Sequence, residues 1–77
     1  VLHSTIGGGV GNTIKLGTFG TTAATIGGGA ANTIEIEDPR YATIAGGYGN
    51  MVNEVGSTIG GGYGNTSTGA ESTVAGG

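Results

Sequence analysis

A β-branched apolar residue returns along the chain inside one short motif, preceded by threonine and followed by small residues. The first, second and fourth copies read Thr-Ile-Gly-Gly-Gly, the third reads Thr-Ile-Ala-Gly-Gly, and the fifth reads Thr-Val-Ala-Gly-Gly. The apolar residues of the five copies are Ile6, Ile26, Ile44, Ile59 and Val74. An asparagine follows six residues after each isoleucine, at Asn12, Asn32, Asn50 and Asn65. This half of the repeat is therefore constant in length.

The other half of the repeat varies in length. The next threonine comes 13 residues after Asn12, 11 after Asn32, and eight after Asn50 and Asn65. The basic repeat thus has 15 residues, and the first two copies carry five and three extra residues. A fixed half beside a half with insertions indicates stacked coils whose loops all leave from one edge. Fifteen residues are too few for a two-helix repeat, and each glycine would cost a helix about 1 kcal/mol.

We therefore predict an all-β fold, a parallel β-solenoid (β-roll) of about five coils with two short strands per coil. Strict alternation after the first two asparagines supports the strands, since Thr13-Ile14-Lys15-Leu16 and Thr33-Ile34-Glu35-Ile36-Glu37 place apolar residues on one face. Ser67 replaces the inward apolar residue in the fourth copy, so we expect the core to thin there. The predicted inward residues are Ile6, Ile14, Leu16, Ile26, Ile34, Ile36, Ile44, Val52, Ile59 and Val74, with Val55 as a further candidate.

Two adjacent glycine columns predict a close backbone neighbour or a simple turn. Gly8, Gly28, Gly46, Gly61 and Gly76 form one column, and the residues directly after them form the next. The neighbour would be either the opposite sheet of a flat coil or another chain, because glycine permits an approach that a side chain would block. Tyr48 and Tyr63 share a column with Val10 and Ala30, and form either a contact between chains or an exposed stack. Our candidate chain–chain contacts are therefore Gly8, Gly28, Gly46, Gly61, Tyr48 and Tyr63.

The insertions at 17–22 and 37–40 lie on the edge where sequence change is tolerated, and Pro39 sets a turn there. Contact with another molecule is expected on this edge. The candidate partner-contact residues are Lys15, Phe19, Glu35, Glu37, Arg40 and Tyr41.

The amino-acid composition excludes several classes of protein. The chain of 77 residues has 20 glycines without a Gly-X-Y period, which excludes collagen. Its net charge is −3 and only 9% of residues are charged, so we expect neither nucleic-acid binding nor membrane insertion. The constant Ile or Val column argues against disorder. Ten or eleven inward side chains barely offset the ordering entropy, so we expect stability only in a homo-oligomer or beside further repeats, and the 77 residues to be one segment of a longer fibrous protein.

The pattern Asn65-x3-Gly69-x2-Ser72-Thr73-Val74-Ala75-Gly76-Gly77, preceded by Ser57-Thr58-Ile59-Gly60-Gly61-Gly62, resembles the YadA-like head repeats of trimeric autotransporter adhesins. Related repeats occur in phage tail-fibre and other bacterial surface proteins. The resemblance covers nearly all of the chain and is clearest from Asn50 onward. It implies a left-handed parallel β-roll, a trimer, an extracellular, cell-surface or virion location, and attachment to a host or matrix surface molecule.

No catalytic, cofactor or metal site is expected. Gly9-Val10-Gly11 lacks the following helix that a nucleotide-binding loop needs, and no Lys-Ser/Thr pair completes a P-loop. Asp38 is the only aspartate, so a calcium-binding solenoid is excluded, and His3 and the serines lack partners for catalysis. The leading hypothesis is a rigid, adhesive fibre segment. A self-assembling filament stays open as an alternative. An ice-binding solenoid also stays open but is less favoured; it would use the single column of Thr5, Thr25, Thr43, Thr58 and Thr73.

Overall fold

The computed structural model describes residues 4–15, 23–35 and 41–77, and every regular element within these ranges is a β-strand. One sheet has five strands: β1 (Thr5–Ile6), β3 (Thr25–Ile26), β5 (Thr43–Ile44), β7 (Thr58–Ile59) and β9 (Thr73–Val74). The other has four: β2 (Thr13–Lys15), β4 (Thr33–Glu35), β6 (Met51–Val52) and β8 (Thr66–Ser67). All neighbouring strands are parallel, so the predicted β-solenoid is confirmed. There are slightly fewer complete turns than the five predicted coils, because the fifth repeat contributes only β9.

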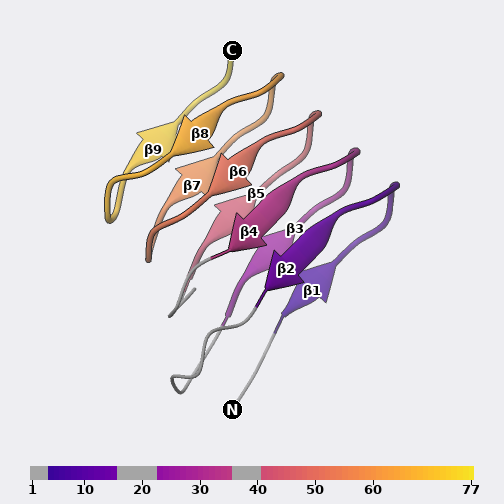
Figure 1. Ribbon diagram of the computed structural model, residues 1–77, viewed down its shortest axis with the longest axis horizontal. Coiled ribbons are helices and arrows are strands. Elements are labelled where there is room, and N and C mark those ends of the chain that lie inside the picture. The colour runs from indigo at the N-terminus through magenta and orange to yellow at the C-terminus, as the bar shows by residue number, and fades with distance from the viewer. Residues whose placement is uncertain (1–3, 16–22, 36–40) are drawn as a thin grey trace.

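The two sheets form two flat layers, and successive coils stack along the solenoid axis (Figure 1). The molecule measures 30 × 24 × 12 Å, and Figure 1 looks down the shortest of these dimensions onto the sheets. Strands β1 and β9 lie at opposite ends of the stack. Short connections join the sheets on one edge of each coil, and residues 53–57 and 68–72 connect them on the other edge. We call these the glycine edge (residues 7–12, 27–32, 45–50 and 60–65) and the variable edge.

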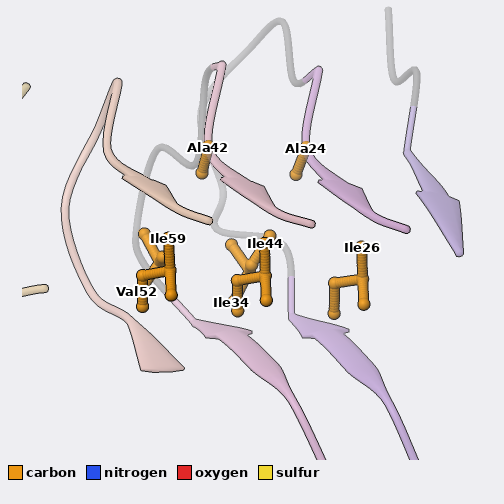
Figure 2. Close-up of a cluster of buried hydrophobic side chains, with 7 residues drawn as sticks. All are labelled: Ala24, Ile26, Ile34, Ala42, Ile44, Val52 and Ile59. Carbon is orange, nitrogen blue, oxygen red and sulfur yellow. The ribbon is translucent and has the colours of Figure 1, made fainter. Parts of the chain in front are cut away.

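The strands align residue on residue, because every coil repeats the same motif in the same register. Thr25 pairs with Thr43 and Ile26 with Ile44, and the same alignment continues to the neighbouring coils. Ile26, Ile44 and Ile59 of one sheet point between the layers toward Ile34 and Val52 of the other (Figure 2). All five of these side chains are fully buried. The predicted inward columns are thus confirmed in the middle coils.

The inward positions near the ends of the stack are less covered. Ile6 is 44% exposed because only β3 lies beside its strand, whereas Ile14 and Val74 are half-buried and pack against the core. Val55 is half-buried, and Leu16 and Ile36 lie outside the described residues. The buried set also contains a column that the sequence analysis did not assign, formed by Ala24, Ala42 and Ser57. It lies one residue before each threonine, on the same side of the strand as the isoleucine two positions later.

Ser67 occupies the inward column of Ile34 and Val52, as predicted, and is 2% exposed. Its hydroxyl is the one buried side-chain polar atom without a hydrogen-bond partner in the described part of the chain. Ser57 Oγ, by contrast, donates to the Gly69 carbonyl oxygen at 2.8 Å. The core therefore becomes smaller and more polar toward the C-terminal coils.

The outer surface of the five-stranded sheet is uniform along the stack. Its outward column contains threonine in every strand, and the next exposed column contains only glycine or alanine. We call this surface the threonine face, and its column is Thr5, Thr25, Thr43, Thr58 and Thr73. The outer column of the other sheet is interrupted by Met51, which pairs with Thr33 and Thr66.

Candidate functional sites on the two edges

The glycine edge brings successive coils closer together than side chains allow. Gly47 has a φ of 95°, a conformation that L side chains rarely adopt. A Cβ atom at Gly47 would overlap the carbonyl oxygen of Gly62 in the next coil, and would lie 2.8 Å from its nitrogen and 2.7 Å from Asn50 Nδ2. Equivalent overlaps occur at Gly9, Gly29 and Gly62. Glycine is required in this column because the neighbouring coil occupies the place of a side chain.

The sequence left a close backbone neighbour or a simple turn open for both glycine columns. The structure restricts the close neighbour to the second column, where it is the next coil of the same chain rather than the opposite sheet. In the first column, a Cβ at Gly8, Gly28, Gly46 or Gly61 meets nothing within 4 Å inside the chain. Of the alternatives, a close neighbour within the chain is therefore excluded for this column. Its assignment as a contact between chains stays a prediction.

A ladder of buried asparagines fills the interior of the glycine edge. Asn32 Nδ2 donates to the carbonyl oxygens of Gly28 at 3.0 Å and Gly47 at 3.1 Å, and to Asn12 Oδ1 at 3.1 Å. The backbone N–H of Asn32 also donates to Asn12 Oδ1, at 3.0 Å. Asn50 repeats all of these bonds one coil later, and both Asn32 and Asn50 are fully buried. Each side chain thus binds polar backbone groups of its own coil and of the next coil, and the side-chain oxygen of the preceding asparagine.

Sequence reasoning found the asparagine column but missed its burial. The available signal was the constant six-residue distance from isoleucine to asparagine, which a purely solvated turn residue would not require. A buried amide must have partners for its N–H and C=O groups, and only stacked copies of the same turn supply all of them. The asparagines are therefore structural residues rather than ligand-binding ones.

Outside this ladder, the glycine edge carries an exposed aromatic stack. The Tyr48 and Tyr63 rings lie parallel, with centroids 5.2 Å apart and 9° between their planes. They remain 52% and 73% exposed, and they continue the column of Val10 and Ala30 through parallel bridges. The sequence left two alternatives for this column, and the stack between neighbouring coils is observed. A contact of the same tyrosines with another chain stays a prediction.

The structure brings together two of the six candidate partner-contact residues. Lys15 Nζ and Glu35 Oε2 form an ion pair at 2.8 Å, with both side chains largely exposed. Hydrogen bonding to Glu35 and its negative charge raise the pKa of Lys15 above its usual value. Tyr41 is 68% exposed at the variable edge and has a φ of 58°. Phe19, Glu37 and Arg40 lie outside the described residues.

The chemistry that the described residues offer is limited to hydroxyls, amides, tyrosines and single charged groups. Within residues 4–15, 23–35 and 41–77, no three His, Cys, Asp or Glu residues lie together in a way that could hold a metal ion. The same ranges contain no helix of the length and hydropathy that crossing a membrane requires. Comparisons of the chain with protein-family models, with curated proteins and with solved structures found no match. The likeness to YadA-like head repeats accordingly rests on the sequence motif alone.

Proposed function

We propose that this chain is a non-catalytic segment of an extracellular fibre, in which it forms part of a rigid stalk or head. The observation that carries the proposal is that the glycine edge is constant from coil to coil, whereas the variable edge is not. The glycine edge repeats the same hydrogen bonds in every coil, through Asn32, Asn50 and their neighbours. A solenoid with such an edge resists bending and shear between coils, since any displacement breaks several buried hydrogen bonds at once. In its described residues 53–57 and 68–72, the variable edge has no such asparagine ladder.

In this proposal the variable edge makes contact with other molecules. The residues assigned to that contact are Lys15, Phe19, Glu35, Glu37, Arg40 and Tyr41. Exposed loops on a rigid scaffold are the usual location of binding residues, because the scaffold tolerates changes in them. The resemblance to trimeric autotransporter adhesins suggests attachment to a host or matrix surface molecule, a cell-surface location and assembly of three chains.

A second candidate function is a self-assembling extracellular filament or a phage tail-fibre segment. The observation in its favour is that β1 and β9 are the outer strands of a parallel sheet whose register repeats from coil to coil. Outer strands of this kind carry unpaired backbone groups that can pair with another chain. An ice-binding solenoid is favoured less, because the threonine face has one threonine column and the opposite sheet is interrupted by Met51.

Sedimentation velocity of the purified chain tests the proposal. A discrete species at a small multiple of the 7.3 kDa chain mass, with a β-rich far-UV spectrum, is the expected result. A broad distribution of very large particles would instead support the filament. A stable folded monomer at micromolar concentration would contradict the assembly on which the fibre depends.

A further inference from the structure

The backbone holds Tyr48 and Tyr63 side by side in neighbouring coils. The two residues pair in a parallel bridge. Tyr48 N donates to the Gly62 carbonyl oxygen at 2.9 Å, and Gly64 N donates to the Tyr48 carbonyl oxygen at 2.8 Å. Their rings are stacked with centroids 5.2 Å apart and 9° between the planes. The register of the coils therefore fixes two phenol groups next to each other along the solenoid axis.

Both phenols are open to reagents in solution, since Tyr48 is 52% and Tyr63 73% exposed. Their column continues with Ala30 and Val10, which carry no phenol. The chain has three tyrosines, and the third, Tyr41, is 68% exposed on the variable edge. The molecule thus presents one adjacent pair of phenols and one separate phenol of similar exposure, which serves as an internal comparison.

Two adjacent phenols can be joined by oxidation. A peroxidase-type oxidant removes one electron and one phenolic proton from each ring, and hydrogen peroxide takes up these two electrons and two protons to become two molecules of water. Each phenoxyl radical shares its unpaired electron with the Cε carbons. A bond then forms between one Cε atom of each ring. These two carbons lose their protons, the two oxygens regain protons, and the resulting dityrosine has two hydrogen atoms fewer than the starting pair.

The arrangement of Tyr48 and Tyr63 favours this coupling within one chain. The parallel bridge places both side chains at the same position of their coils. The exposed rings can turn about χ2, a torsion that is broad for tyrosine, until their edges meet. Holding the two radicals beside each other makes the coupling a unimolecular step, which is faster than an encounter with a radical on another chain.

We propose that Tyr48 and Tyr63 form an oxidative cross-linking site, at which a peroxidase-type oxidant joins the coils of β5 and β7 through a dityrosine bond. The chain contains no cysteine, so a disulfide cannot join its coils. A bond between these tyrosines stabilises the two coils by restricting the unfolded chain, as a disulfide does. The inference goes beyond the proposed fibre function and does not depend on it, because both tyrosines belong to one chain.

Treatment of the purified chain with a haem peroxidase and hydrogen peroxide tests the proposal. The sample is an equal mixture of isotopically labelled and unlabelled chains, and dityrosine fluorescence measures the yield. Cleavage after Glu54 separates the two tyrosines, so mass spectrometry can identify a linked pair of peptides that lacks two hydrogen atoms. We expect both linked peptides to carry the same label. The melting temperature of the linked chain should rise by about 10 °C or more.

Three conservative variants complete the test. Tyr48→Phe and Tyr63→Phe keep the stacked rings but remove one phenol each, and should lower the dityrosine yield at least tenfold with an unchanged far-UV spectrum. Tyr41→Phe is the matched control and should keep the wild-type yield. An equal loss in Tyr41→Phe, or no linked peptides from the folded wild type, overturns the inference.

The labels and the oligomeric state separate the remaining outcomes. Linked peptides that combine the two labels would place the bond between chains, and would also overturn the inference. A stable monomer in sedimentation velocity contradicts the proposed fibre function. If that monomer still forms the bond between Tyr48 and Tyr63, the cross-linking site stands without the fibre.

Discussion

Two adjacent glycines, Gly46 and Gly47, differ in whether the fold can accept a side chain at their position. This difference gives the sharpest prediction. The change is Gly47→Ala, and the control is Gly46→Ala one residue earlier. A methyl group at Gly47 would overlap the carbonyl oxygen of Gly62 and adopt a φ of 95°. At Gly46 the same methyl group meets nothing within 4 Å, and the backbone lies outside the region that disfavours side chains.

The loss of folding free energy in Gly47→Ala follows from the hydrogen bonds that the added methyl group would displace. The Gly62 carbonyl oxygen accepts from Tyr48 N at 2.9 Å and from Asn50 Nδ2 at 3.1 Å. Losing or lengthening both costs about 2 kcal/mol, at about 1 kcal/mol for each bond. Backbone strain at a positive φ adds about 1–3 kcal/mol. The expected loss of about 3–5 kcal/mol is a large part of the roughly 4–12 kcal/mol that a chain of 77 residues typically has.

Urea denaturation followed by far-UV circular dichroism measures both variants. Gly46→Ala should change the free energy of unfolding little, or raise it by about 0.4–1 kcal/mol by restricting the unfolded chain. Gly47→Ala should be unfolded or strongly destabilised. If the two variants differ by less than 1 kcal/mol, the close stacking of coils at the glycine edge is not what requires glycine there.

Three further predictions concern single buried or strained positions. Ser67→Ala should raise the free energy of unfolding by about 1 kcal/mol, because it removes a buried hydroxyl without a hydrogen-bond partner. Ser57→Ala should lower it by about as much, because it breaks a hydrogen bond to a carbonyl oxygen. Equal changes of the melting temperature in the two variants would refute this. Ala31→Gly should stabilise by about 0.5–1 kcal/mol, since Ala31 has a φ of 55°, and Gly49→Ala, with a φ of 66° in the same column, should destabilise by a similar amount. Asn50→Asp should destabilise strongly at neutral pH, because burial raises the pKa of the new carboxyl above its unfolded value. The variant should then be most stable below the pKa that this carboxyl has in the unfolded chain, and lose stability as the pH rises through its pKa in the folded chain. If denaturation curves at acidic and neutral pH coincide, the asparagine ladder is not buried as described.

Much of the fold could be predicted from the sequence, because the interactions that form it recur with the repeat. The threonine and isoleucine columns alternate with the strand period, so the inward set that includes Ile26 and Ile44 follows directly. The replacement of Val52 by Ser67 also identified where the core becomes more polar. Insertions confined to one half of the repeat predicted one edge for the variable segments, and the described ones, 53–57 and 68–72, share an edge, whereas the insertions themselves lie outside the described residues.

The parts that could not be predicted depend on distances between coils. Nothing in a column of glycines shows which member faces the next coil, so Gly46 and Gly47 looked equivalent until their φ angles and neighbours were known. The burial of Asn50 was missed because asparagine after glycine usually indicates an exposed turn, and only the stacking of equal turns supplies its hydrogen-bond partners. The pairing of Lys15 with Glu35 likewise required the strand register.

The glycine edge maintains the solenoid, whereas the variable edge tolerates changes in length. A matched pair of insertions tests this difference directly: six glycine and serine residues placed between Glu54 and Val55 on the variable edge, or between Tyr48 and Gly49 on the glycine edge. The measurement is urea denaturation of both proteins beside the wild type. The insertion after Glu54 should lower the free energy of unfolding by less than about 1 kcal/mol, as expected for lengthening a surface loop. The insertion after Tyr48 should abolish the cooperative transition. Equal tolerance of the two insertions, or a greater loss from the one after Glu54, would contradict it.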